Sequence, residues 1–134
     1  MKKQFAAITL AVLSTVPASA FACSFNYSIY AAESISKRIS AQIGKYVTNE
    51  YCQKYNKEYQ IVIIAQGYMT ETLSVGHSIV GLRKRGSNVY PANARSGFRS
   101  KEGNHAVSVS FDLAAQTAMD NLIDVMSDMD ANLN

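Results

Sequence analysis

The chain has 134 residues, with 13 Lys and Arg against 10 Asp and Glu. Residues 1–20 are expected to be removed and carry Lys2 and Lys3, so the 114 residues that remain have 11 basic and 10 acidic side chains, a net charge of +1. This near-neutral balance argues against a nucleic-acid-binding protein. A chain of this length forms one domain with one core, so we expect 21–134 to be a single domain.

Residues 1–20 are predicted to be a secretory signal peptide. Lys2 and Lys3 give a basic start, and residues 5–16 form an apolar stretch that is too short to span a bilayer. Residues 17–20, Pro-Ala-Ser-Ala, supply the helix breaker and the small residues of a cleavage site. No later apolar run approaches the roughly 20 residues of a membrane helix. The sequence therefore predicts a periplasmic or secreted protein.

Cys23 and Cys52 are the only cysteines in the sequence. Outside the cytoplasm an even number of cysteines indicates a disulfide, so we predict a Cys23–Cys52 bond. An intermolecular disulfide is an alternative. Cleavage after Ala22 instead of Ala20 would make Cys23 the first residue and would permit a lipid anchor there, although Ala20-Phe21-Ala22 matches a lipidation site poorly.

The first element of the mature chain is predicted to be a helix. Apolar residues recur there at steps of three and four: Ile35, Ile39, Ile43, Tyr46 and Val47. The disulfide limits this helix, because an unbroken helix from Ala31 to Cys52 would span about 30 Å, whereas residues 23–31 reach only about 28 Å when fully extended. We therefore predict that the helix starts late, near Ser34, or breaks near Gly44.

Two strands are predicted to follow. Residues 59–65 form a short β-branched run that is apolar on both faces, as in a central strand. The next strand has a predicted buried face made of Leu73, Val75, His77 and Ile79, which alternate with small residues. The apolar phase then moves to Val80 and Leu82, and we expect a bulge near Gly76 or Gly81 to cause this shift.

The C-terminal part is predicted to be a third strand and a second helix. Val107, Val109 and Phe111 alternate with serines, and Asp112 is suited to cap the helix that follows. The apolar stripe of that helix comprises Ala115, Ala118, Leu122, Val125 or Met126, and Met129. The sequence therefore predicts an α+β fold, with an N-terminal helix, a three-stranded antiparallel sheet and a C-terminal helix, both helices packed on one face of the sheet.

A basic segment at residues 84–104 is the main candidate for function. It lacks clear periodicity, and loops of this length are usually functional or disordered. Arginines beside aromatic residues suit carboxylates, phosphates or an acidic protein surface. The candidate binding residues are Arg83, Arg85, Tyr90, Arg95, Phe98 and Arg99.

An acidic row on the second predicted helix is a weaker candidate. Asp120, Asp124 and Asp128 lie four residues apart, a spacing at which like charges repel. A solvated face explains the row most simply, and a contact with the protein's own basic segment is the functional alternative. One helical row offers few converging oxygens for a metal, so we expect neither a metal nor another cofactor.

Catalytic residues are scarce. The chain has two histidines, His77 and His105, and both lie in phase with apolar residues of predicted strands. The sequence therefore predicts an exported cell-envelope protein that recognises an acidic or polar macromolecule, as an inhibitor or an immunity protein does, without catalysis. The first alternative is a small hydrolase or metal-dependent enzyme that uses both histidines, and the second is a structural subunit of an envelope assembly.

Overall fold

The computed structural model describes residues 23–133, so the predicted signal peptide and its cleavage site lie outside the described residues. The strands and long helices are, in chain order, β1 (Tyr27–Tyr30), α1 (Glu33–Ser40), β2 (Tyr59–Met69), β3 (Leu73–Lys84), β4 (Arg95–Glu102) and α2 (Val107–Ser127). The described residues also form three short helical turns, η1 (Ile43–Lys45), η2 (Tyr51–Tyr55) and η3 (Asp130–Asn132). None of the helices in this range is long and apolar enough to cross a membrane.

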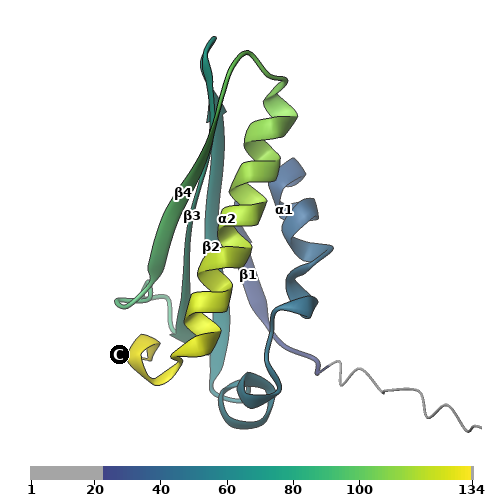
Figure 1. Cartoon of the computed structure of the whole chain (residues 1–134). Helices are drawn as coiled ribbons and strands as arrows, with labels where there is room; N and C mark the ends of the chain where they lie inside the picture. Colours follow the sequence, from purple (N-terminus) through teal and green to yellow (C-terminus); the bar gives the residue numbers. More distant parts are fainter. Residues whose placement is uncertain (1–22, 134) are drawn as a thin grey trace, which may run out of the picture.

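The fold is a two-layer α+β arrangement, as predicted. The four strands form one sheet in the order β1-β2-β3-β4, and α1 and α2 lie side by side on one of its faces (Figure 1). β1 runs parallel to β2, and the other neighbours are antiparallel. The prediction of three antiparallel strands after an N-terminal helix was wrong, because the short strand β1 precedes α1 and makes the sheet mixed.

The predicted third strand was also misplaced. Val107–Phe111 is the first part of α2, and the strand that pairs with β3 is β4, inside the segment predicted to lack periodicity. The N-cap of α2 is Ala106 and not Asp112. The Asp112 carboxylate instead accepts a hydrogen bond from Arg38 of α1 at 2.5 Å, and so joins the two helices.

The helix predicted between Cys23 and Cys52 is short, as the limited reach of residues 23–31 required. Cys23 and Cys52 form the predicted disulfide, with their Cα atoms 5.9 Å apart. The α1 helix ends at Ser40, and the chain then passes through η1 and η2 before it enters β2. Of the predicted apolar stripe, Ile35, Ile39 and Ile43 are buried. The helix starts at Glu33, next to the predicted Ser34, and has already ended at Ser40, four residues before Gly44.

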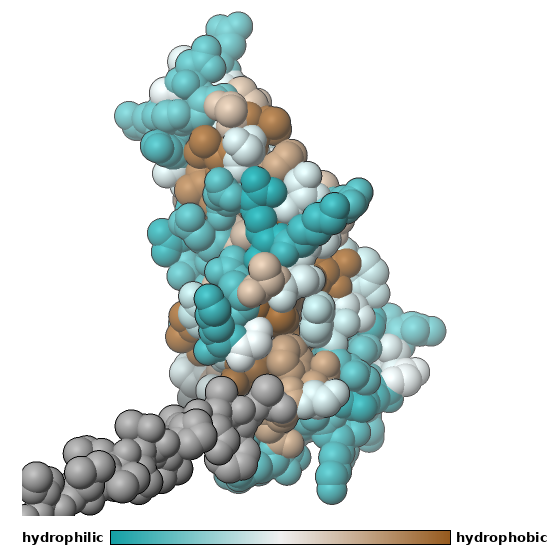
Figure 2. All heavy atoms as spheres, turned by 90° about the vertical axis from the view of Figure 1, so that its right-hand side faces the viewer, coloured by the Kyte–Doolittle hydropathy of each residue, from teal (hydrophilic) through white to brown (hydrophobic). Residues whose placement is uncertain are grey.

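The core lies between the helices and the sheet. The predicted stripe of α2 is buried there, against the odd-numbered residues Ile61, Ile63 and Ala65 of β2. Figure 2 shows the outer side of the helix layer, where hydrophilic residues predominate and hydrophobic ones form separate patches between them. Within residues 23–133, the opposite face of the sheet carries no helix (Figure 1).

In its first half, β3 turns its small residues toward the helices in place of the predicted apolar ones, whereas Val80 and Leu82 further along are buried on the helix side as predicted. Ser74, Gly76 and Ser78 face α2, whereas His77 and Ile79 point to the helix-free face and are only partly buried. A Cβ built on Gly76 would lie 2.0 Å from the Ala114 backbone nitrogen, so the close approach of α2 requires small residues here. The register of β3 with both neighbours is continuous through this region, and no bulge is needed.

Candidate binding surface

Three of the six predicted binding residues, Arg95, Phe98 and Arg99, lie on β4, which is an edge strand, whereas Arg83 lies in β3 and Arg85 and Tyr90 lie in the loop that follows β3. Among the described residues β3 is the sole sheet partner of β4, and nearly the whole of β4 is exposed. Arg95 and Arg99 lie on the helix side of β4, since Gly97 between them faces Asn121 of α2. Phe98 lies on the opposite, helix-free face and is 71% exposed. The structure thus separates the arginines of β4 from its aromatic residue.

The loop between β3 and β4 is folded back against the sheet. Pro91 is buried on the helix-free face, and a Cβ built on Gly81 of β3 would lie 2.6 Å from the Pro91 Cβ. Tyr90 is partly exposed beside it, and burial raises the pKa of its phenol. Tyr90 lines a shallow hollow with Leu82 and Arg83 at the end of β3 and with Leu133, and the strand β4 itself stays open.

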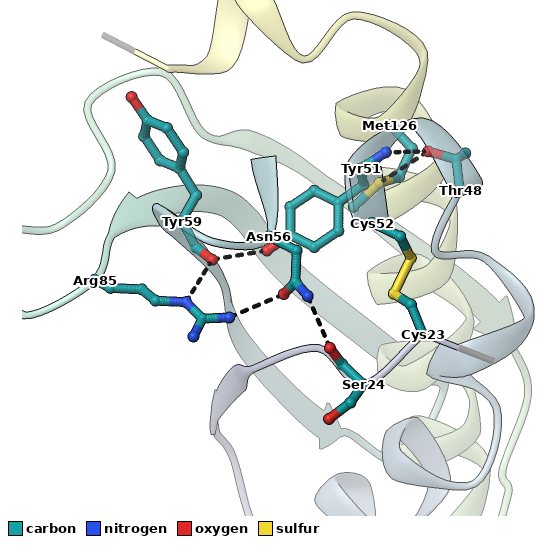
Figure 3. Close-up of a disulfide and its surroundings, with 9 residues drawn as sticks. All are labelled: Cys23, Ser24, Thr48, Tyr51, Cys52, Asn56, Tyr59, Arg85 and Met126. Carbon is teal, nitrogen blue, oxygen red and sulfur yellow. Dashed lines mark hydrogen bonds between the residues drawn. A yellow bond between two sulfur atoms is a disulfide. The ribbon is translucent and has the colours of Figure 1, made fainter. Parts of the chain in front are cut away.

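The Arg85 side chain makes hydrogen bonds within the protein, close to the disulfide (Figure 3). Its guanidinium donates to the Tyr59 carbonyl at 3.2 Å and to the Asn56 side-chain oxygen at 2.9 Å. The Asn56 amide in turn donates to the Ser24 carbonyl at 2.7 Å, next to the disulfide. Tyr51 donates its hydroxyl to the same Tyr59 carbonyl at 3.1 Å. Arg85 therefore joins the end of β3 to the start of β2 and, through Asn56, to the N-terminal segment.

The other arginines differ in their partners. Arg99 is paired with Asp120 of α2 at 2.7 Å, so the predicted contact between the acidic helix row and the protein's own basic segment is present. Arg83 donates to the Gln60 side-chain oxygen, at 2.9 and 2.7 Å, in the amide orientation that satisfies both groups. Within residues 23–133 Arg95 and Lys101 have no side-chain hydrogen bond or ion pair. These two cations are the ones free to meet a ligand along β4.

The helix-free face carries aromatic residues that the sequence analysis did not select. Tyr30 is 53% exposed and Tyr68 is 56% exposed. In the register of the sheet, Tyr30 lies beside Ile64, and Tyr68 lies beside Val75. Alternation along β2 could have identified Tyr68, because the even-numbered residues of β2 lie beside the odd-numbered residues of β3 on this face. Tyr30 lies on β1, at the far edge of the sheet from β4, and Tyr68 lies near the end of β2, so neither residue adjoins Phe98.

The two histidines do not share a site. His77 lies on the helix-free face opposite Phe98, whereas His105 follows β4, with a ring nitrogen 2.8 Å from the Glu102 carbonyl oxygen. Phe98 and Glu102 are four residues apart, which is about 13 Å along a strand. Residues 23–133 contain no group of three or more His, Cys, Asp or Glu side chains arranged to hold a metal. This geometry gives no support to an enzyme that uses both rings.

A hollow beside β1 is the other concave feature. It lies where β2 continues past the end of β1 and is lined mainly by apolar and aromatic residues, among them Tyr30, Ile35, Tyr68 and Phe111. The tyrosine hydroxyls are its only titratable groups among the described lining residues. The lining supplies no acid and base pair for catalysis.

The comparisons with known proteins identify no relative, so a proposal about function rests on the geometry of the sheet and its edge strand. No model of a known protein family matches the chain, and no curated protein matches its sequence.

Proposed function

We propose that this chain is an exported, non-enzymatic binding protein of the cell envelope that recognises an acidic segment of a partner protein through β4. The observation that carries the proposal is the strand itself, an exposed edge with unpaired Arg95 and Lys101 on one side and exposed Phe98 on the other. Arginine and aromatic side chains are frequent anchors of protein interfaces. An inhibitor or an immunity protein is one form that such a binder takes.

Export is supported by two independent features. The N-terminal 20 residues have the pattern of a signal peptide, and the described residues contain a disulfide and no free cysteine. Disulfides persist in oxidising compartments and are rare in the cytoplasm. The partner is therefore expected in the periplasm or outside the cell.

The test is binding of poly-L-glutamate, measured by calorimetry at about 0.1 M salt with the mature protein. We expect the Arg95→Ala/Arg99→Ala variant to bind about tenfold more weakly, since it loses the unpaired Arg95 and leaves the Asp120 carboxylate uncompensated beside β4. The matched control is Lys45→Ala/Lys57→Ala, which removes two exposed cations outside β4. Its affinity should change little, because the general attraction between exposed charges is screened over about 10 Å at moderate salt.

Thermal stability separates a binding effect from unfolding. The Arg99–Asp120 pair is about half exposed, and pairs of this kind contribute less than about 1 kcal/mol. The melting temperature of the arginine variant should therefore stay close to that of the wild type. Unchanged binding of the arginine variant, or an equal loss in the lysine control, would show that β4 is not the surface that binds poly-L-glutamate.

A further inference from the structure

The direction of the backbone groups of β4 follows from its pairing with β3. The Gly103 N–H donates to the Thr72 carbonyl at 2.8 Å, and Leu73 is the register partner of Glu102. Residues of an antiparallel pair alternate between bonding the neighbour and pointing away from it. The N–H and C=O groups of Ser96, Phe98 and Ser100 therefore point away from β3, along the free edge of the sheet.

We propose that the acidic partner segment binds as a fifth strand along this edge. The inference rests on the proposed function and specifies how the partner is held. An extended peptide that joins an exposed sheet edge gains main-chain hydrogen bonds for affinity, and alternate side chains give it specificity. Eight residues of β4 are available for the pairing.

The side chains of β4 define the sequence that the edge would accept. On the helix side, Arg95 and Lys101 are unpaired and lie at the two ends of the strand. On the helix-free side, Phe98 is largely exposed between Ser96 and Ser100. An incoming strand that alternates acidic and apolar residues would place its carboxylates toward the cations and its apolar side chains against Phe98.

A second copy of this chain is a poor occupant of the edge. Antiparallel pairing of two β4 strands centred on Phe98 would set Arg95 of each copy opposite Lys101 of the other. Like charges directly opposite each other destabilise a strand pair. Charged residues on an edge strand are also a common protection against self-association. The charge of β4 thus favours an acidic partner over self-pairing.

The experiment uses the mature protein and an eight-residue peptide that alternates glutamate with valine. Hydrogen exchange is followed at each amide of β4. We expect the amides of Ser96, Phe98 and Ser100 to exchange about tenfold more slowly with saturating peptide, as newly bonded amides do. The amides of Gly97 and Arg99, already bonded to β3, are the internal controls and should change less.

Two matched perturbations test the backbone bonds directly. Ser100→Pro removes one outward N–H, which an edge strand tolerates, and should weaken binding about tenfold, whereas Ser100→Ala keeps the N–H and should bind as the wild type does. Should the proline variant lose its fold by circular dichroism, N-methylated peptides replace it. Alternate amides of a strand point in opposite directions, so methylation of one set should abolish binding, and methylation of the other set should preserve it.

The outcomes separate the two proposals. Slower exchange at the three outward amides together with unequal effects of the two methylated peptides supports strand addition. A peptide that binds and depends on Arg95, with unchanged exchange and equal effects of the methylated peptides, overturns strand addition and leaves acidic recognition standing. No binding of this peptide or of poly-L-glutamate overturns both.

Discussion

The Arg99 guanidinium lies 2.7 Å from the Asp120 carboxylate and so joins the edge strand β4 to α2. The pair neutralises the central cation on the helix side of β4, and among residues 23–133 no side chain pairs with Arg95 or Lys101 at either end. The intramolecular pair also uses part of the acidic row that a head-to-tail envelope assembly would need.

Release of Arg99 should strengthen the binding of acidic ligands. Asp120→Asn removes the carboxylate and its competition for the guanidinium, so we expect a few-fold higher affinity for poly-L-glutamate at low salt. Stability should change by less than about 1 kcal/mol, because the pair is half exposed. Asp124→Asn, one turn further along α2, is the control for the loss of negative charge. An equal gain in both variants would show that only net charge matters.

The approach of α2 to β3 should be intolerant of any side chain at Gly76. In Gly76→Ala the new Cβ would meet the Ala114 backbone at 2.0 Å, which neither backbone can avoid without moving α2. We expect a loss of about 3 kcal/mol or more in the free energy of unfolding, measured with urea. Gly44→Ala, where no atom lies within 4 Å of the new Cβ, should be close to neutral. A stable Gly76→Ala protein would contradict this packing.

Arg85 should contribute to stability more than to binding. Arg85→Ala removes hydrogen bonds to the Tyr59 carbonyl and to Asn56, and we expect a loss of about 1–2 kcal/mol in urea unfolding. Its neighbour Lys84 is exposed and unpaired within the described residues, so Lys84→Ala should change stability by less than about 0.5 kcal/mol. A large loss of poly-L-glutamate binding in Arg85→Ala without destabilisation would restore Arg85 to the binding surface.

Stability should decline in alkaline solution because two tyrosines hold their protons in the folded state. Burial raises the pKa of Tyr51 to about 12, and the hydrogen bond to Asp130 raises the pKa of Tyr55 to about 12. The unfolded chain releases these protons near pH 10. The folded state binds more protons between about pH 10 and 12, so the free energy of unfolding falls across this window and is insensitive to these groups below it.

Ultraviolet absorbance during a pH titration follows the tyrosinates directly. Tyr55→Phe should remove one late-titrating group and reduce the alkaline slope of stability in urea unfolding. Ordinary titration of all tyrosines near pH 10 would contradict the two contacts.

Much of the helical layer was predictable because its signals are local. The stripe of α2 and the short α1 follow from apolar spacing and from the reach of the disulfide tether. The start of α2 was missed because Val107, Val109 and Phe111 alternate over five residues, a window in which a helix and a strand cannot be told apart. The burial of Ser110 reflects the packing of the helix on the sheet, which no local pattern encodes.

The edge strand could not be recognised for a different reason. β4 has no buried face of its own, since one side carries Arg95, Arg99 and Lys101 and the other carries two serines around Phe98. Without an apolar alternation, period-two analysis has no signal to detect. The candidate binding residues were selected as a basic and aromatic group, but their partners within the protein, Asp120 for Arg99 and Asn56 for Arg85, became visible only in three dimensions.

The most direct measurement is a nuclear magnetic resonance titration of the isotopically labelled mature protein with poly-L-glutamate at low salt. Our account predicts that the amide shifts concentrate along residues 95–101 of β4 and weaken as salt is added. Shifts that concentrate instead at Lys54 and Lys57, or the absence of any shift, would contradict the claim that β4 recognises an acidic partner.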